Sequence, residues 1–411
     1  MDIELVTIGT ELLLGFTVDT NSAFAGQALA ARGVRVVRRT SVRDEPHAIR
    51  DAVREALART GVVITTGGLG PTRDDISKKV VADLFDAPLE FNDGLWAAMV
   101  ERYRRLGRVP VDSNRSQAEV PRGATILPNR WGSASGLWLE GKPGVAILLP
   151  GVPLEMRNLM EHEVVPRLAA RTGNGSVIRS RSLRTAAIAE AVLAERLGEI
   201  ESDIAPLTLA YLPDTTGVDL RLTAWDLAPA DADRRLAAAA ELIRARAGGH
   251  VFGEGNADLA AVLLEALRRS KVRLAVAESC TGGLVGGRIT AIPGSSDVFL
   301  GATVAYANAV KTAQLDVAAE LIERHGAVSE EVARAMARGA RERFGAEAAV
   351  SVTGIAGPDG GSEAKPVGTV WFGVSVGDHE ETVRYVFLGG REEIRARAAQ
   401  MALYLLWRQV R

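Results

Sequence analysis

Apolar strand-like runs alternate with amphipathic helical stretches near both ends of this chain of 411 residues. In the first third, the runs IELVTIGT, VRVVRRTSV and GVVITTGGLG are separated by NSAFAGQALAARG and AIRDAVREALART. Strands and helices in alternation are typical of a parallel sheet that is covered by helices on both faces. A later apolar run, GVAILLPG, leads into PLEMRNLMEHEVVPRLAAR, whose apolar residues recur at helical spacing. We therefore predict a first α/β domain over residues 1–171.

The same alternation returns in the last part of the chain. The strand-like runs VRLAVAES, VFLGATVAYA and AEAAVSVTGIAG are interleaved with helical stretches such as VSEEVARAMARGARERFG, and a closing helix begins at Arg391. The stretch VWFGVSVGDHEETVRYVF favours an antiparallel hairpin. These patterns predict a second α/β domain over residues 256–411.

A shorter segment separates these two domains. It begins at the polar, glycine-containing break TGNGS and holds short strand-like runs and one long helical stretch. A chain of this length is too long for one hydrophobic core. The predicted fold class is therefore α/β, with two three-layer α/β domains joined by a small α+β middle domain over residues 172–255.

The charge balance argues against nucleic acid as the main ligand. Lys and Arg number 49 and Asp and Glu number 51, so the formal net charge is -2 and direct nucleic-acid binding is not expected. The single cysteine cannot form an internal disulfide, and the first residues are acidic where a secretory signal has basic ones. Because no apolar run reaches the roughly 20 residues of a membrane helix, we expect a cytoplasmic protein without a membrane span.

A glycine-rich corner follows the third strand-like run, in GVVITTGGLGPTRDD. Freed backbone N–H groups and the start of a helix form a site for phosphate, which here would involve Gly67, Gly68, Gly70 and Thr72. Asp74 and Asp75 add carboxylate oxygens suited to Mg or a similar divalent cation. The alternative is an ordinary turn whose acidic residues stabilise a helix start.

Two other polar clusters belong to the same predicted sheet edge. IGTELLLGFTVDTNS places Thr10, Glu11 and Asn21 after the first strand, where open α/β sheets bind ligands. RWGSASG adds Ser133 in a loop of small residues, although such loops are often plain surface turns.

AESCTGG places three side chains that can act as nucleophiles, Ser279, Cys280 and Thr281, just before the helix that Gly282 and Gly283 open. Backbone N–H groups at such a position can stabilise an oxyanion, so we expect Thr281, Gly282 and Gly283 to hold a phosphate or an oxyanion of the substrate. A Ser or Thr here can equally be a simple helix cap.

Other residues of the last domain bear on these alternatives. His325 and His379 lie in turn-like sequence, so a Ser-His-Asp triad and a His/Cys zinc site are poorly supported. Lysine is scarce in this domain, and Lys311 follows the run VFLGATVAYA. A partly desolvated lysine can lose its proton and serve as the base for a neighbouring hydroxyl, which makes a Ser-Lys pair one candidate. Another candidate takes Cys280 as the nucleophile, with Glu278 and Lys311, as in nitrilase-like amidases.

The loop SVTGIAGPDGG would bring Thr353 and the backbone of Gly354 to the same edge, or it is an ordinary loop with a Pro-Asp-Gly turn.

Several of these stretches, taken together, resemble a known protein family. AESCTGG, AIPGSSDVF, VAYANAVK, HGAVSE, SVTGIAGPDGG, KPVGTVWFGV and GGREEIR together look like the CinA C-terminal domain, the nicotinamide mononucleotide deamidase fold. GTELLLGFTVDTNS, TTGGLGPTRDD, SNRSQAEVP and LLPGVPLEM look like the CinA N-terminal domain, which is similar to molybdopterin-binding proteins of the MoaB/MogA type.

The resemblance implies a bifunctional enzyme of pyridine nucleotide recycling. The C-terminal domain would hydrolyse the amide of nicotinamide mononucleotide to nicotinic acid mononucleotide and ammonia, with no cofactor required. The N-terminal domain would be a metal-dependent pyrophosphatase that cleaves ADP-ribose to AMP and ribose 5-phosphate. Ser279 matches the nucleophile of the family and Lys311 its base, while Tyr306, Thr353 and Arg391 match positions that line the substrate site.

The resemblance also implies a homodimer. A different class of function is a partner-binding protein in DNA uptake or damage response, as the competence-related name of the family suggests. For the N-terminal domain, the non-catalytic alternative is a module that binds a nucleotide or molybdopterin.

Overall fold

The computed structural model describes residues 1–172 and 176–411, so three residues of the predicted TGNGS break, 173–175, lie outside the described residues. Contacts between residues divide the chain into two compact units, namely Met1–Arg179 with Ala224–Arg234, and Ser180–Thr223 with Arg235–Arg411. The division into three domains, with boundaries at residues 171 and 255, stays a prediction.

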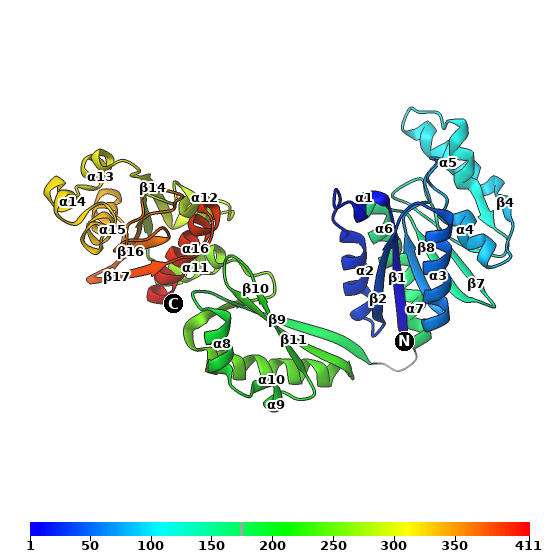
Figure 1. The fold of residues 1–411 in the computed structure, drawn as a ribbon, viewed down its shortest axis with the longest axis horizontal. Helices are drawn as coiled ribbons and strands as arrows, with labels where there is room; N and C mark the ends of the chain where they lie inside the picture. Colours follow the sequence, from blue (N-terminus) through cyan, green and yellow to red (C-terminus); the bar gives the residue numbers. More distant parts are fainter. Residues whose placement is uncertain (173–175) are drawn as a thin grey trace. The chain divides into compact units, whose positions relative to one another are not determined.

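The first unit contains a six-stranded sheet in the order β2-β1-β3-β8-β7-β6 (Figure 1). Strands β2, β1, β3 and β8 run parallel, as the alternating pattern predicted. β7 is antiparallel to β8, and β6 is antiparallel to β7, which extends the sheet at one side. The bounds are β1(Asp2–Ile8), β2(Arg35–Val42), β3(Val62–Thr66), β6(Thr125–Leu127), β7(Gly136–Gly141) and β8(Gly144–Leu149).

Helices cover both faces of this sheet and each face has its own core. α2(Thr20–Ala30), α6(Pro153–Leu159), the π-helix η2(Met160–Val164) and α7(Val165–Thr172) pack on one face. α3(Pro46–Thr60) and α4(Ser77–Leu84) pack on the other. In α3 the spacing of Ile49, Val53, Ala56 and Leu57 puts four buried residues on one side of the helix.

The first unit has further short elements outside this sheet. They are α1(Thr10–Leu13), β4(Leu89–Phe91), α5(Asp93–Arg105), the 3-10 helix η1(Asp112–Ala118) and β5(Glu119–Pro121), with β4 and β5 paired as an antiparallel ribbon.

The middle segment forms the predicted α+β arrangement, with a four-stranded sheet in the order β10-β11-β9-β12. Its strands are β9(Val177–Thr185), β10(Thr208–Pro213), β11(Val218–Leu227) and β12(Val251–Glu254). Its helices are α8(Glu190–Leu197), α9(Ile200–Asp203), α10(Pro229–Ala247) and the 3-10 helix η3(Gly248–His250).

The C-terminal part contains a five-stranded sheet in the order β14-β13-β15-β16-β17. β13 is parallel to β14 and to β15, while β15, β16 and β17 are successively antiparallel, so the predicted hairpin is confirmed. The bounds are β13(Leu274–Glu278), β14(Phe299–Val304), β15(Ala348–Gly354), β16(Thr369–Val376) and β17(His379–Val386).

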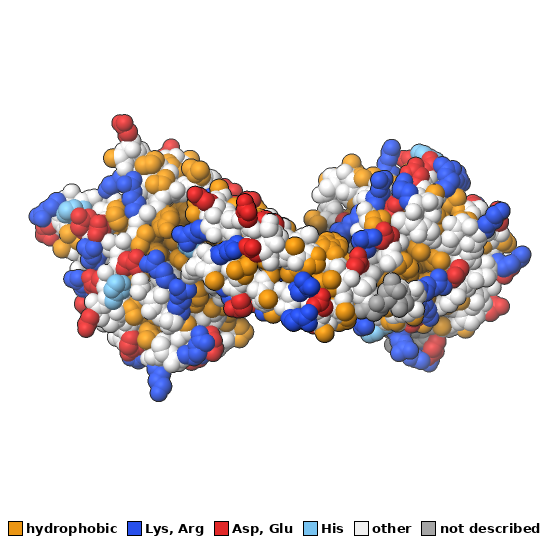
Figure 2. All heavy atoms as spheres, turned by 90° about the horizontal axis from the view of Figure 1, so that it is seen from below, with side chains coloured by type: hydrophobic (Ala, Val, Ile, Leu, Met, Phe, Trp, Pro, Cys, Tyr) orange, Lys and Arg blue, Asp and Glu red, His pale blue; other side chains and the backbone are white. Residues whose placement is uncertain are grey.

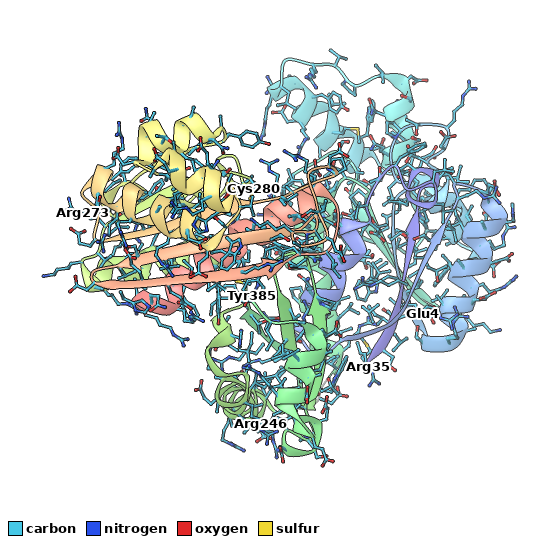
Figure 3. The ribbon with its side chains drawn as sticks, turned by 60° about the vertical axis from the view of Figure 1, so that its left-hand side comes forward. Glu4, Arg35, Arg246, Arg273, Cys280 and Tyr385 are labelled. Atoms are coloured by element: carbon cyan, nitrogen blue, oxygen red, sulfur yellow. The ribbon has the colours of Figure 1, made fainter. Side chains whose placement is uncertain are left out.

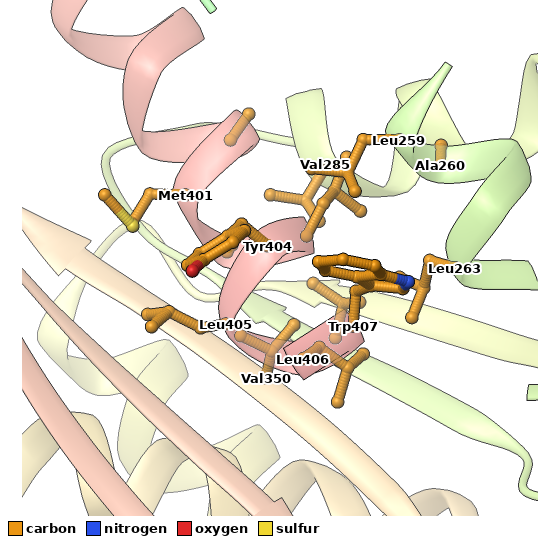
Figure 4. Packing of buried hydrophobic residues seen from close by; sticks show 14 of the residues in the cluster. Leu259, Ala260, Leu263, Val285, Val350, Met401, Tyr404, Leu405, Leu406 and Trp407 are labelled. Carbon is orange, nitrogen blue, oxygen red and sulfur yellow. The ribbon is translucent and has the colours of Figure 1, made fainter. Parts of the chain in front are cut away.

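Two helical layers enclose this sheet, which completes the predicted three-layer arrangement (Figure 1). One layer holds α11(Leu259–Ser270), α12(Leu284–Thr290) and α16(Arg391–Val410), and the other holds α13(Asn308–Leu315), α14(Ala319–His325) and α15(Glu330–Phe344). The 3-10 helix η4(Ser295–Asp297) precedes β14. Tyr404 and Trp407 of α16 pack beside Leu263 of α11 and Val285 of α12 (Figure 4). This packing fixes α16 against the helix that follows the AESCTGG stretch.

The surface carries charges of both signs. On the face drawn in Figure 2, basic and acidic side chains are interspersed over both units. Within the described part of the chain, none of the helices is long and apolar enough to cross a bilayer.

Candidate active site

The carboxyl ends of β13, β14 and β15 meet at one edge of the C-terminal sheet because the three strands are parallel. A cavity of about 290 Å³ lies there. Six of the residues predicted for this site line it, namely Ser279, Lys311, Tyr306, Thr353, Gly354 and Arg391. The structure thus brings together side chains that are up to 112 positions apart in the sequence (391 − 279).

Lys311 is almost completely buried, with 1% of its surface exposed. Its Nζ donates hydrogen bonds to the carbonyls of Ala305 and Tyr306, at 3.0 and 3.2 Å. Burial lowers the pKa of this amine, and the described residues offer it no carboxylate as an ion-pair partner. A neutral lysine has two N–H donors and one lone pair. The carbonyls of Ala305 and Tyr306 can accept both N–H donors of a neutral Lys311. The lone pair of the amine then remains free to accept the proton of a serine hydroxyl.

Ser279 follows the last residue of β13 and is 8% exposed. Its backbone N–H donates to the carbonyl of Val352 at 2.8 Å, and its own carbonyl accepts from the N–H of Gly282 at 3.1 Å. The main chain of the candidate nucleophile is therefore held on both sides, while its side chain lies at the cavity.

Glu278 has a structural role that the sequence did not indicate. Its fully buried carboxylate accepts hydrogen bonds from the N–H groups of Gly283, Val285 and Gly286, at 2.9, 3.1 and 2.8 Å. It thereby satisfies N–H groups at the start of α12 and anchors the turn that carries Ser279.

These contacts correct one expectation. The N–H groups near Thr281, Gly282 and Gly283 were expected to hold an oxyanion, yet the N–H of Gly282 donates to the carbonyl of Ser279 and that of Gly283 to the carboxylate of Glu278. Neither glycine lines the cavity, and neither does Thr281, whose buried hydroxyl has no partner among the described residues. Both glycines have positive φ, 60° and 96°, so they are needed for the shape of the turn.

Cys280 lines the cavity beside Ser279 (Cys280 is labelled in Figure 3). Burial raises the pKa of its thiol to about 12, so the thiol stays protonated at neutral pH and is a poor nucleophile. The carboxylate of Glu278 is occupied by backbone N–H groups. The alternative set of Cys280, Glu278 and Lys311 therefore lacks both an activated thiol and a free carboxylate.

Arg391, at the start of α16, forms one wall of the same cavity. Its Nη2 donates to the hydroxyl of Tyr306 at 3.0 Å, and its Nη1 donates to the carbonyl of Gly357 at 2.6 Å. Thr353 is buried, and its hydroxyl donates to the carbonyl of Ala327 at 2.7 Å. The guanidinium stays partly open to solvent and can meet an anionic group.

Two lining residues with polar side chains, Asn308 and Asp359, escaped the sequence-based prediction. Asn308 is the first residue of α13, and Asp359 belongs to the Pro-Asp-Gly turn. The only sequence feature that could have identified them as site residues is their position shortly after a strand.

A second cavity, of about 460 Å³, lies at the carboxyl ends of β1, β3 and β8 in the first unit. Most of the residues predicted there line it, namely Glu11, Gly67, Gly68, Gly70, Thr72, Asp74, Asp75 and Ser133. Thr10 and Asn21 do not line it. The N–H and hydroxyl of Thr10 donate to Asp44, at 2.9 and 3.0 Å, and the amide of Asn21 donates to the carbonyl of Gly151 at 2.8 Å. The structure corrects the expectation for both, because each donates to a residue of the lining and does not itself belong to it.

The glycine-rich turn of this cavity leaves no room for side chains. A Cβ on Gly68 would lie 2.0 Å from the Oγ of Ser77, and one on Gly70 would lie 2.5 Å from Asp75. The Oγ of Ser77 is buried and has no partner among the described residues. Asp75 accepts from the N–H of Thr72 at 2.8 Å, so this carboxylate also shapes the turn.

Asp44, Gln117 and Glu155 line the cavity although the sequence did not single them out. Burial raises the pKa of Glu155, which accepts a hydrogen bond from Asn129. The structure also explains Gly132 in RWGSASG, because a Cβ there would lie 1.7 Å from the carboxylate carbon of Glu155.

The lining of this second cavity is anionic. Five carboxylates face it, those of Glu11, Asp44, Asp74, Asp75 and Glu155, and no Lys or Arg of the described chain belongs to the lining. Within the described residues, no three acidic, His or Cys side chains gather closely enough to hold a metal ion by themselves. Mg²⁺ commonly binds through one or two carboxylates together with substrate phosphates. The donor set therefore fits a cation that is shared with a phosphate group.

Comparisons with known proteins agree with this arrangement. Residues 256–410 match the CinA C-terminal domain, residues 4–170 match a family described as "Probable molybdopterin binding domain", and residues 180–253 match the damage-inducible protein CinA KH domain. A CinA-like protein of Gemmatimonas aurantiaca is 53% identical over 98% of this chain and 95% of its own length. A CinA-like protein of Salinibacter ruber is 44% identical over 97% of this chain and 98% of its own. The crystal structure of competence/damage inducible protein CihA from Agrobacterium tumefaciens is 40% identical over 36% of this chain and 91% of its own, with a TM-score of 0.35.

Proposed function

The chain belongs to the family of CinA-like proteins, and on this premise we propose that it is a pyridine nucleotide recycling enzyme with two hydrolytic sites. At the C-terminal site it would hydrolyse the carboxamide of nicotinamide mononucleotide to nicotinic acid mononucleotide and ammonia. The observation that carries this proposal is a buried lysine that lines the same cavity as a serine and has no carboxylate partner among the described residues.

The reaction follows from the protonation state of Lys311. The neutral amine takes the proton of the Ser279 hydroxyl while Oγ attacks the amide carbon, and the carbonyl π electrons move to oxygen. When the carbonyl re-forms, the C–N bond breaks, and the lysine returns the proton to the leaving nitrogen so that ammonia departs. Water then attacks the acyl-enzyme with Lys311 again as base, which frees Ser279 and the carboxylate product.

The other wall of the cavity supplies recognition of the nucleotide. Arg391 carries a guanidinium that suits a phosphate, and Tyr306, which accepts one of its hydrogen bonds, is 60% exposed beside it. Asp359 also lines the cavity and can accept hydrogen bonds from ribose hydroxyls.

The test is ammonia release from nicotinamide mononucleotide by the full chain and by Ser279→Ala. The native chain is expected to release ammonia, and Ser279→Ala to lose about 10⁴-fold or more of kcat, because the nucleophile is gone. Cys280→Ala, a change at the adjacent residue, should lose less than about tenfold. A Ser279→Ala protein with near-native turnover would exclude the Ser-Lys mechanism.

At the N-terminal cavity we propose hydrolysis of ADP-ribose to AMP and ribose 5-phosphate, with Mg or a similar divalent cation. The supporting observation is a glycine-rich turn that faces five carboxylates. A diphosphate would be repelled by this lining unless a cation compensated the charge. A bound cation would supply that compensation on the phosphate oxygens.

The residues of the chain have separate parts in this second proposal. Asp74, with Asp44 nearby in the lining, would hold the cation, while the N–H groups of residues 67–70 would receive the phosphates. The buried hydroxyl of Ser77, which has no partner among the described residues, lies 2.0 Å from where a Cβ of Gly68 would be, so this position of the turn requires glycine.

AMP release from ADP-ribose, measured with and without added Mg²⁺, tests the N-terminal activity. We expect AMP only with the cation. Tight binding of ADP-ribose without any turnover would instead favour a nucleotide-binding module.

A further inference from the structure

Another cavity, of about 350 Å³, lies within the second compact unit of the chain. Residues 187–190 and 213–218 of the middle segment form one part of its lining. Five residues between Tyr385 and Met401 form the other part. None of the residues that line the two proposed hydrolytic sites belongs to this lining. The cavity is therefore separate from both sites.

The two parts of the lining are held together by packing. Ala186, next to the first lining residue, belongs to the same buried core as Leu405 and Trp407 of α16. The ring of His250 stacks on the ring of Tyr404, with centroids 5.7 Å apart and planes 7° apart. A pocket with walls that are already fixed binds a ligand at a lower entropic cost than one that forms only on binding.

Apolar side chains form most of the lining. Tyr385 of β17 and Phe387, just after that strand, have ring centroids 5.8 Å apart and planes 13° apart (Tyr385 is labelled in Figure 3). Ile188 and Met401 add aliphatic and thioether surface (Met401 is labelled in Figure 4). Aromatic rings and methionine sulfur both make favourable contacts with a flat aromatic ring. The lining therefore favours a ligand with an aromatic body.

Gln400 is the one deeply buried polar side chain of this lining, with 4% of its surface exposed. Its Oε1 accepts a hydrogen bond from Nη1 of Arg288 at 2.5 Å. Because a guanidinium can only donate, this contact fixes which end of the amide is the oxygen. The Nε2 of Gln400 has no acceptor among the residues that the structure describes. A buried N–H group without an acceptor is costly, so the cavity favours a ligand that brings one.

Arg397 adds a second donor group to the lining. It lies three positions before Gln400 on α16, so the two side chains share one side of the helix. Its Nη1 donates to the carbonyl of Leu388 at 2.9 Å, and no carboxylate of the described chain forms an ion pair with it. Since both groups are donors and one is a cation, they favour the oxygens of an anion, and they offer nothing to an amine.

Two acidic residues, Glu190 and Asp214, also belong to the lining. Both are exposed, so water and salt screen their charges. The Oδ1 of Asp214 accepts from the N–H groups of Thr216 and Gly217, at 2.5 and 2.9 Å, and this carboxylate therefore shapes its own turn. The buried donor of Gln400 and the half-buried Arg397 are thus better placed to set the charge of a bound ligand.

We propose that this cavity binds a small aromatic carboxylate. The ring of the ligand packs against Tyr385, Phe387 and Met401, and its carboxylate accepts hydrogen bonds from Nε2 of Gln400 and from the guanidinium of Arg397. This is a binding site in which no covalent bond changes. The inference is independent of the two hydrolytic activities proposed above, because it uses none of their residues.

The experiment titrates the full chain with naphthalene carboxylate, followed by NMR of the ligand. We expect saturable binding with a Kd of about 1 mM or lower, as for a ligand of this size in a preformed pocket. Naphthalene carboxamide, which has the same ring but no charge, should bind at least about tenfold more weakly. Decanoate, a carboxylate without an aromatic ring, should also bind more weakly than naphthalene carboxylate.

Two substitutions test the donors. Gln400→Glu keeps an oxygen for Arg288 but replaces the N–H donors by a second carboxylate oxygen, so binding should weaken at least about tenfold. Arg397→Ala removes the cation and should weaken binding about tenfold. The matched control is Arg384→Ala, because this exposed arginine also donates to a single carbonyl, that of Ala364, but does not line the cavity. It should bind as the native chain does.

Four results would overturn the inference. They are the lack of saturable binding by the native chain up to about 10 mM ligand, native affinity in both Gln400→Glu and Arg397→Ala, equal affinity for the carboxylate and the carboxamide, and tighter binding of decanoate than of naphthalene carboxylate. Thermal melting checks that each variant is folded. If Gln400→Glu does not melt cooperatively, Arg397→Ala decides, and native affinity in that variant contradicts the proposal.

Discussion

The two cavities sit at equivalent edges of their sheets yet have opposite linings. The C-terminal cavity holds Lys311 and Arg391 with Asp359 as its one acidic lining residue among those described, whereas the N-terminal cavity holds five carboxylates and no basic side chain of the described chain. In the proposed reaction at the first, the protein would provide nucleophile and base from its own side chains. In the proposed reaction at the second, the protein would provide oxygen ligands, and a cation would compensate the charge of the phosphates.

The difference shows how burial determines chemistry. Packing of α13 against the sheet buries Lys311 beside carbonyl groups, and this environment favours the neutral amine that a base requires. The N-terminal carboxylates lie at an open, glycine-lined edge, where a cation and phosphates can enter together. Each prediction below either separates the two sites or shows that the contrast is wrong.

Removal of divalent cations should give the largest difference between the two activities. Chelation should abolish AMP release from ADP-ribose, because the anionic lining then repels the diphosphate. Ammonia release in the same sample should change less than about twofold, since no step at Ser279 requires a metal. Added Mg²⁺ should restore AMP release. Equal loss of both activities would break the comparison.

Lys311→Met should lower kcat for ammonia release about 10³-fold, because the base is lost. In the native chain, activity should fall as the pH drops through the pKa of Lys311, because the protonated amine has no lone pair. Burial lowers that pKa, so the loss of activity at acidic pH should occur below the usual pKa range of a lysine side chain. Lys311→Met should not show this pH-dependent loss. Lys271→Met, an exposed lysine at the end of α11, is the control in pH profiles of kcat.

Alkylation of Cys280 tests whether the thiol takes part in the chemistry. Because its pKa is raised to about 12, the thiolate fraction at neutral pH should be about 10³-fold below that of an ordinary cysteine. Iodoacetamide should label the native chain slowly and the denatured chain quickly, as followed by mass spectrometry. Fast native labelling that stops ammonia release would restore the cysteine mechanism.

Asp74→Asn should raise the Mg²⁺ concentration needed for half-maximal AMP release about 10- to 100-fold, because one oxygen ligand loses its charge. Asp83→Asn is the control, since that carboxylate is exposed on α4 and pairs with Lys79. A shift of the same size in both variants would mean that general surface charge, and not a bound cation, controls the activity.

Much of the fold could be predicted from the sequence because it depends on local periodicity. The β/α alternation at both ends, the hairpin of β16 and β17 and the α+β middle segment all follow from patterns within short windows. The antiparallel extension by β6 and β7 escaped prediction, since its short strands carry a weak pattern.

The candidate sites were predicted only in part. Residues at strand ends, such as Ser279 and Asp74, could be named because the carboxyl edge of a parallel sheet gathers side chains. The placement of Ser279 with Lys311 as a catalytic pair also drew on family resemblance. Homodimerisation stays a prediction of that resemblance, and a divalent cation at Asp74 and Asp75 stays a prediction.

The sequence by itself determined the layers, the edge at which polar side chains meet and the glycines that shape both turns. Only the tertiary structure decided which groups are already occupied. The N–H groups of Gly282 and Gly283, expected for an oxyanion, bond to Ser279 and Glu278. Thr10 and Asn21 bond to lining residues of the N-terminal cavity without lining it, and Arg395 of α16 contacts the carbonyl of Cys280. The physical reason is that periodicity fixes which face a residue occupies, whereas hydrogen-bond partners depend on three-dimensional neighbours that can lie far away in the chain, as Asn21 and Gly151 do at 130 positions apart.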